Sequence, residues 1–158
     1  MDLPPSVRQT LGRGGLPRFE IATPLAQAEV YLYGGQVTHF QPAGAQPVLF
    51  TSRHSFYESG RPIRGGVPVI FPWFGAKKDD PSAPAHGVAR LRLWEAESVR
   101  ELVDGRVELV LRLQSGEGAE PWILRHHILV GQELTLALEI VNNGSGDFRC
   151  EEALHTYF

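Results

Sequence analysis

Apolar and polar residues alternate along much of the chain with a period of two, most clearly in its second half. In residues 106–113, Leu109 and Leu111 alternate with Glu108 and Arg112, as expected for a strand with one buried face. Comparable extended segments are predicted at residues 19–21, 30–33, 37–40, 48–50, 122–130 and 134–140. No window of a dozen or so residues sustains the helical period of about 3.6 residues. The pattern therefore predicts an all-β protein, an antiparallel β-sandwich or barrel.

The two ends of the sequence differ from this pattern. Residues 1–17 contain four glycines and prolines in close succession around Gly14 and Pro17, and we expect a flexible N-terminal arm there. Residues 18–158 then form one sandwich domain. The chain stops at an aromatic, strand-like segment, whereas chain ends are usually polar and frayed. We therefore expect these residues to be the N-terminal portion of a longer sandwich.

Composition excludes several classes of protein. The chain has 158 residues, 15 Lys+Arg and 18 Asp+Glu, and its net charge of −3 argues against nucleic-acid and anionic-membrane partners. Its single cysteine, Cys150, excludes an internal disulfide framework. The start has no signal-peptide pattern, and the most apolar stretch, near residues 67–76, is too short to span a membrane. A cytoplasmic protein without a membrane partner is expected.

The densest candidate for chemistry is the segment from Arg61 to Gly75, RPIRGGVPVIFPWFG. Arg64 stands before two glycines, which would let backbone approach a ligand closely, and arginine suits bidentate recognition of an anion. The aromatic residues that follow offer flat faces for a sugar ring. The alternatives are a solvated arginine and a bent edge strand with a core aromatic cluster.

Two further segments carry candidate site residues. In Ala85–Arg90, a His86-Gly87 step exposes an imidazole, and Arg90 offers a second guanidinium to the same anion. Near the end, His155 is suited to proton transfer near neutral pH, and on a strand it shares a face with Tyr157. For each of these residues the alternative is a role in the scaffold, such as a histidine satisfied within the core.

Metal and nucleotide motifs are absent from the sequence. Neighbouring strand residues face opposite ways, so His126 and His127 cannot chelate one metal together. The chain has no His-Glu-x-x-His motif, no G-x-G-x-x-G fingerprint and no P-loop. We expect no metal site and no cofactor.

Together these segments resemble the hexose-6-phosphate mutarotases, or glucose-6-phosphate 1-epimerases, of the galactose mutarotase-like superfamily. The resemblance runs from about Ile21 to Phe158 in the motifs IRGGVP, FPWFG, HGVAR and LHTYF. It implies an isomerase with a large antiparallel supersandwich, here truncated, that interconverts the α and β anomers of a hexose 6-phosphate.

The resemblance also implies roles for individual residues. Arg64 and Arg90 would contact the substrate phosphate, and His86 would help to hold the sugar. His155 would act as a general acid–base together with a glutamate near the far C-terminus of the family. Some relatives carry glutamine where this chain has Ala85, so the resemblance does not carry over that one phosphate contact, whereas it keeps the pair of arginines.

Two other functions stay open on the sequence alone. One is a non-catalytic carbohydrate-binding sandwich that has kept the pocket and lost the catalytic glutamate. The other is a structural sandwich that binds no sugar. Binding of a hexose phosphate and exchange of its anomers would separate the three hypotheses.

Overall fold

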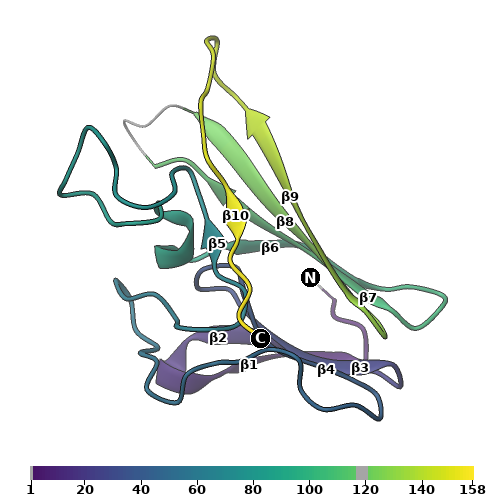
Figure 1. Ribbon diagram of the computed structural model, residues 1–158. Helices are drawn as coiled ribbons and strands as arrows, with labels where there is room; N and C mark the ends of the chain where they lie inside the picture. Colours follow the sequence, from purple (N-terminus) through teal and green to yellow (C-terminus); the bar gives the residue numbers. More distant parts are fainter. Residues whose placement is uncertain (1, 117–120) are drawn as a thin grey trace.

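The computed structural model describes residues 2–116 and 121–158, and its regular secondary structure is almost entirely antiparallel β-strand (Figure 1). The first sheet contains, in order, β1 (Val7–Leu11), β2 (Pro17–Ala22), β3 (Ala26–Tyr31) and β4 (Gln36–Pro42). The second contains β6 (Glu95–Glu101), β7 (Val107–Gln114), β8 (Trp122–Val130) and β9 (Leu134–Asn142). A short pair joins β5 (Val69–Ile70) to β10 (Ala153–Leu154), and two 3-10 turns occur, η1 (Arg13–Gly15) and η2 (Ala89–Leu91). The all-β, antiparallel prediction is confirmed.

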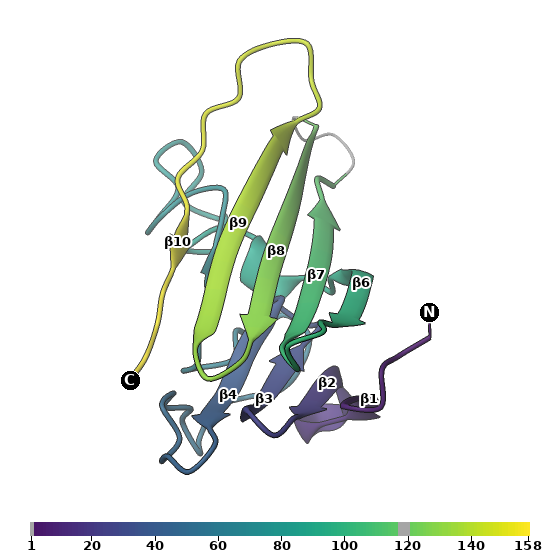
Figure 2. The same ribbon diagram turned by 90° about the vertical axis from the view of Figure 1, so that its right-hand side faces the viewer.

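The alternating sequence pattern explains how the two sheets pack. Along β8, every second residue from Trp122 to Val130 is buried, and the residues between them are partly exposed. Its buried face joins that of β7 and the inner residues of the first sheet in one core, which includes Phe19, Val37 and Leu111. Figure 2 shows the second sheet face-on, with the first sheet below it. Among the described residues, no helix is long and apolar enough to cross a membrane.

Three segments differ from the sequence-based predictions. The expected flexible arm over residues 1–17 includes β1, an edge strand paired with β2, because Val7 is an apolar residue that the core buries. Strand β6 was not predicted, since Val99 is its only buried residue. Residues 48–50, predicted to be extended, form no regular strand, although Thr51 makes an isolated bridge to Gly65.

The β5–β10 pair extends beyond its two assigned residues at each end and keeps one register. Amide groups of Glu151, His155 and Tyr157 donate to the carbonyls of Pro72, Pro68 and Gly66, at 2.9–3.0 Å. Because successive strand residues face opposite ways, this ladder separates His155 and Tyr157 from Leu154, Thr156 and Phe158. One face therefore presents imidazole and phenol groups, and the other presents mainly apolar groups.

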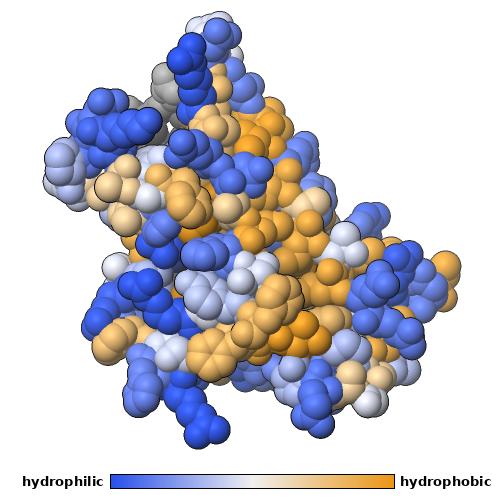
Figure 3. Space-filling view, viewed as in Figure 1, coloured by the Kyte–Doolittle hydropathy of each residue, from blue (hydrophilic) through white to orange (hydrophobic). Residues whose placement is uncertain are grey.

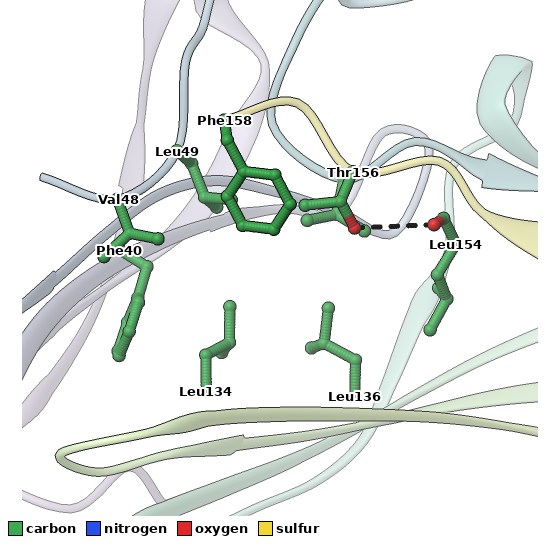
Figure 4. A pocket seen from close by; sticks show the side chains of 9 residues that line it. Phe40, Val48, Leu49, Leu134, Leu136, Leu154, Thr156 and Phe158 are labelled. Carbon is green, nitrogen blue, oxygen red and sulfur yellow. Dashed lines mark hydrogen bonds between the residues drawn. The ribbon is translucent and has the colours of Figure 1, made fainter.

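The apolar face of this ladder borders a groove that opens between the two sheets. The groove has a volume of about 360 Å³ and is lined by Phe40, Val48, Leu49, Val67, Leu134, Leu136, Leu154, Thr156 and Phe158. Figure 4 shows Leu134 and Leu136 of β9 on one side and the ring of Phe158 on the other. In the space-filling view, apolar residues form a continuous band across this part of the surface (Figure 3).

Candidate functional site

The polar face of the β5–β10 ladder brings together aromatic and imidazole rings from three distant segments. The ring centroid of His155 lies 6.2 Å from that of His86, 6.4 Å from that of Phe74 and 5.0 Å from that of Tyr157. Phe74 also contacts His86 edge-on, at 4.8 Å. The two histidines predicted from the sequence therefore share one cluster, and His155 is exposed rather than buried in the core.

A reciprocal pair of hydrogen bonds fixes the orientation of His86. Its backbone N–H donates to the carbonyl of Gly75 at 2.7 Å, and the N–H of Gly75 donates to its Nδ1 at 3.2 Å. The backbone of His86 has a φ of 65°, which residues other than glycine rarely adopt. The two hydrogen bonds hold this conformation in place. Because Nδ1 accepts, the proton of the neutral ring lies on Nε2, where it can be donated to a ligand.

Arg90 and Arg64 lie close enough to His86 to influence its ionisation, and Arg64 lies close enough to Arg90 to influence that of Arg90. Burial, together with the charges of Arg90, His155 and Arg64, lowers the pKa of His86. Burial and the charge of Arg64 lower the pKa of Arg90, while Tyr157 opposes that shift. In the described part of the chain, neither guanidinium forms an ion pair with a carboxylate. The site therefore concentrates positive charge without a direct ion pair among the described residues, although the carboxylate of Glu151 accepts from the N–H of Phe74 at 2.8 Å.

Both arginines stand on backbone that the fold holds in position. Arg90 lies in η2, and its Nη2 donates to the carbonyl of Ala85 at 2.7 Å. The N–H of Arg64 donates to the hydroxyl of Ser55 at 2.7 Å, and the carbonyl of Gly65 accepts a 2.6 Å bond from Gln36. Neither Ser55 nor Gln36 was predicted as a site residue, because neither stands in a recognisable motif.

Comparison with known proteins gives this arrangement a family. A sequence model of the family described as "Aldose 1-epimerase" matches residues 17–158. The chain belongs to the aldose 1-epimerase family. It is 39% identical over 140 residues to an Escherichia coli K12 protein named "Putative glucose-6-phosphate 1-epimerase", covering 85% of this chain and 46% of that protein. This aldose 1-epimerase family chain therefore spans about half the length of the curated relatives it matches.

Solved structures agree with the family and with the predicted supersandwich. A crystal structure from Salmonella typhimurium, titled a "putative mutarotase", superposes with a TM-score of 0.88 at 29% identity, covering 98% of this chain and 52% of that one. A galactose mutarotase-like protein from Clostridium acetobutylicum gives a TM-score of 0.69 at 13% identity, covering 88% of this chain and 49% of that one. The second similarity bears on the fold alone.

The two glycines after Arg64 in this aldose 1-epimerase family chain lie against neighbouring protein backbone. A Cβ on Gly65 would lie 2.4 Å from the carbonyl oxygen of Phe50, and one on Gly66 would lie 2.2 Å from that of Val37. Both glycines have positive φ. The pair therefore makes room for neighbouring protein backbone, and its close approach to a ligand stays a prediction.

The aromatic residues of the FPWFG segment divide between core and site. Phe71 is fully buried and packs edge-on against Trp122. Trp73 donates its indole N–H to the carbonyl of Pro84, and the ammonium of Lys77 lies over its ring at 4.9 Å. Phe74 alone of the three is both exposed and in contact with the histidines. In the described residues, no group of three or more His, Cys, Asp or Glu side chains is placed to hold a metal ion.

Proposed function

We propose that the protein to which this chain belongs interconverts the α and β anomers of a hexose 6-phosphate. The observation that carries the proposal is the pair of arginines, Arg64 and Arg90, gathered beside two imidazoles without a carboxylate partner in the described residues. Two neighbouring guanidinium groups create a positive potential that favours a dianion. A sugar phosphate supplies the dianion and the ring together.

The proposed reaction is a proton transfer at each of two oxygens. A base removes the proton from O1 of the hemiacetal while an acid donates a proton to O5, and the bond between C1 and O5 breaks to give the aldehyde. Rotation about the C1–C2 bond and closure by the reverse transfers give the other anomer. Each positioned acid or base contributes on the order of 10²–10⁴-fold to such a reaction. No cofactor enters this scheme.

In this scheme His155 donates the proton to O5. The imidazole is exposed on the polar face of the ladder, next to Tyr157 and facing His86, whose Nε2 is free to donate to a sugar hydroxyl. The base at O1 would be the glutamate that the family resemblance implies. The two guanidinium groups hold the phosphate and orient the sugar without touching the reacting bonds.

The test separates binding from catalysis. Affinities for glucose 6-phosphate and glucose are measured by titration calorimetry for the wild type, Arg64→Ala, Arg90→Ala and a matched control, Arg61→Ala, whose guanidinium pairs with Glu58 at the surface. Loss of a charge-assisted contact is expected to weaken glucose 6-phosphate binding about 10–100-fold for the first two variants, leaving glucose binding and the control unchanged. Equal binding of both sugars by the wild type would refute the phosphate assignment.

Anomer exchange is measured by NMR magnetisation transfer between the H1 signals of α- and β-glucose 6-phosphate. The chain and any longer product of the same reading frame are compared with their His155→Gln variants. Faster exchange that the His155→Gln variant loses supports the proposed acid. Tight binding without faster exchange in the longer product would instead favour the non-catalytic carbohydrate-binding alternative.

A further inference from the structure

Gln36 is a fully buried amide at the point where the first sheet meets the Arg64 segment. It begins β4 directly after the Gly34-Gly35 turn. Its Nε2 donates to the carbonyl of Gly65 at 2.6 Å and to that of Ile63 at 3.3 Å. Since both neighbours are carbonyl oxygens, the amide nitrogen must face them, and the assignment of its two ends follows from the contacts. The Gln36 side chain thus bonds to the backbone on both sides of Arg64.

The N–H and carbonyl groups of Arg64 itself are also hydrogen-bonded. Its N–H donates to the hydroxyl of Ser55, and its carbonyl accepts from the N–H of Ser52 at 3.0 Å. Ser55 is itself buried, and its carbonyl accepts from Arg13 at 3.3 Å. The guanidinium of Arg64, in contrast, is exposed and makes no hydrogen bond within the described residues. The fold therefore fixes the base of this side chain and leaves its charged end available.

The turn that carries Gln36 is anchored from the opposite sheet. The buried imidazole of His126 in β8 bonds through Nδ1 to the carbonyl of Gly35 at 2.9 Å. The N–H of Gly34 donates to the carbonyl of Arg92 at 2.8 Å. Both glycines before Gln36 are hydrogen-bonded in this way, so the backbone that carries the Gln36 amide is held independently of the Arg64 segment. It acts as a fixed point for the loop.

The amide oxygen of Gln36 is buried and has no hydrogen-bond partner among the described residues. A buried polar atom without a partner opposes folding, and this cost is offset only by what the other end of the amide does. An apolar side chain of the same size would remove the unpartnered oxygen but would also take the amide donor away from the carbonyls of Ile63 and Gly65, which flank Arg64.

We infer that Gln36 is a positioning residue that sets the affinity for the phosphate-bearing substrate through the placement of Arg64. This rests on the proposed function and adds to it a residue that touches neither sugar nor phosphate. A bidentate contact with an anion depends on the angle as well as the distance of the guanidinium. Releasing the carbonyls of Ile63 and Gly65 therefore weakens the hold on phosphate while leaving the contacts to the sugar ring in place.

The test compares Gln36→Met, which keeps the length of the side chain and removes the donor, with Gln41→Met. Gln41 lies in the same strand and donates at 2.9 Å to the carbonyl of Ala45, in a different loop. Affinities for glucose 6-phosphate, glucose and inorganic phosphate are measured by calorimetry, with near-ultraviolet circular dichroism to verify folding. We expect Gln36→Met to bind glucose 6-phosphate and phosphate about tenfold more weakly, with glucose unchanged and Gln41→Met like the wild type.

Ser55→Ala is a second variant, which removes the acceptor of the Arg64 N–H without changing Gln36. The same selective loss is expected, so the inference is tested even if Gln36→Met does not fold. Equal weakening of glucose and glucose 6-phosphate, or wild-type affinities in the folded variants, would overturn it. If the wild type shows no preference for the phosphorylated sugar, or Arg64→Ala does not remove it, the proposed function itself fails. The two failures are therefore distinguishable.

Discussion

Protonation of the buried His126 is expected to destabilise the fold in acid. The side chain lies wholly inside the core between the two sheets, beside Trp94, and its Nε2 has no partner among the described residues. Burial is the main cause that lowers its pKa from 6.5 to about 4, against the opposing effect of the bond to Gly35. The neutral imidazole fits this position, and the imidazolium does not.

The size of the effect follows from the linkage between proton binding and folding. Above pH 6.5 the ring is neutral in both states, and the free energy of unfolding does not depend on pH through it. As the pH falls from 6.5 to about 4, the unfolded chain binds a proton that the folded chain does not. Each pH unit then removes about 1.4 kcal/mol, and the total approaches roughly 3 kcal/mol.

Urea denaturation between pH 7.5 and about 4.5 measures this loss, with His126→Gln as the non-titrating variant. The wild type should lose stability with acid, and His126→Gln should lose about 2–3 kcal/mol less over the same range. His127→Gln is the matched control, because His127 lies on the outer face of the same strand and pairs with Glu139. The acid loss should persist in that variant. Parallel pH curves for the wild type and His126→Gln would refute the assignment.

Two further substitutions test the packing. Gly66→Ala should destabilise the fold by several kcal/mol in thermal unfolding, because its Cβ would lie 2.2 Å from the carbonyl oxygen of Val37. Gly44→Ala, which also has positive φ but has nothing within 4 Å of its Cβ, should cost only about 1–2 kcal/mol. Leu111→Ala should cost about 2–5 kcal/mol, since the side chain is fully buried between the sheets. Leu11→Ala, at an exposed position, should change stability by less than about 0.5 kcal/mol, and similar losses for the two leucines would contradict the placement of the core.

Strands with a strict apolar alternation could be predicted from the sequence, because that alternation is itself the signature of one buried face. β7 and β8 are of this kind, and β9 keeps the same alternation with apolar residues that are only partly buried beside the groove. β1 and β6 each bury a single valine and owe their conformation to pairing with a neighbouring strand, so local sequence carried little signal for them. Whether such a segment becomes a strand depends on the neighbouring strand with which it pairs as much as on its own residues.

The residues of the candidate site also divide into those that local sequence motifs reveal and those that only tertiary contacts reveal. His86, Arg90, Arg64 and His155 stand in motifs that a sequence alone can reveal, and the structure places them around one cluster of rings. The hydrogen bonds that hold the backbone around Arg64 could not be predicted, because their partners come from β4 and from the loop that precedes Arg64. Such contacts depend on the tertiary arrangement and leave no pattern of spacing.

The single register of the β5–β10 ladder links the position of the His155 imidazole to the packing of the apolar groove on the opposite face. If the terminal segment slipped by one residue, Thr156 would take the place of His155, and the imidazole would turn into the apolar groove beside Leu136. Such a slip would bury a polar ring and expose leucine at the same time, so the misaligned form is disfavoured twice over. The imidazole of His155 is thus held in its place by the apolar side chains on either side of it in the sequence.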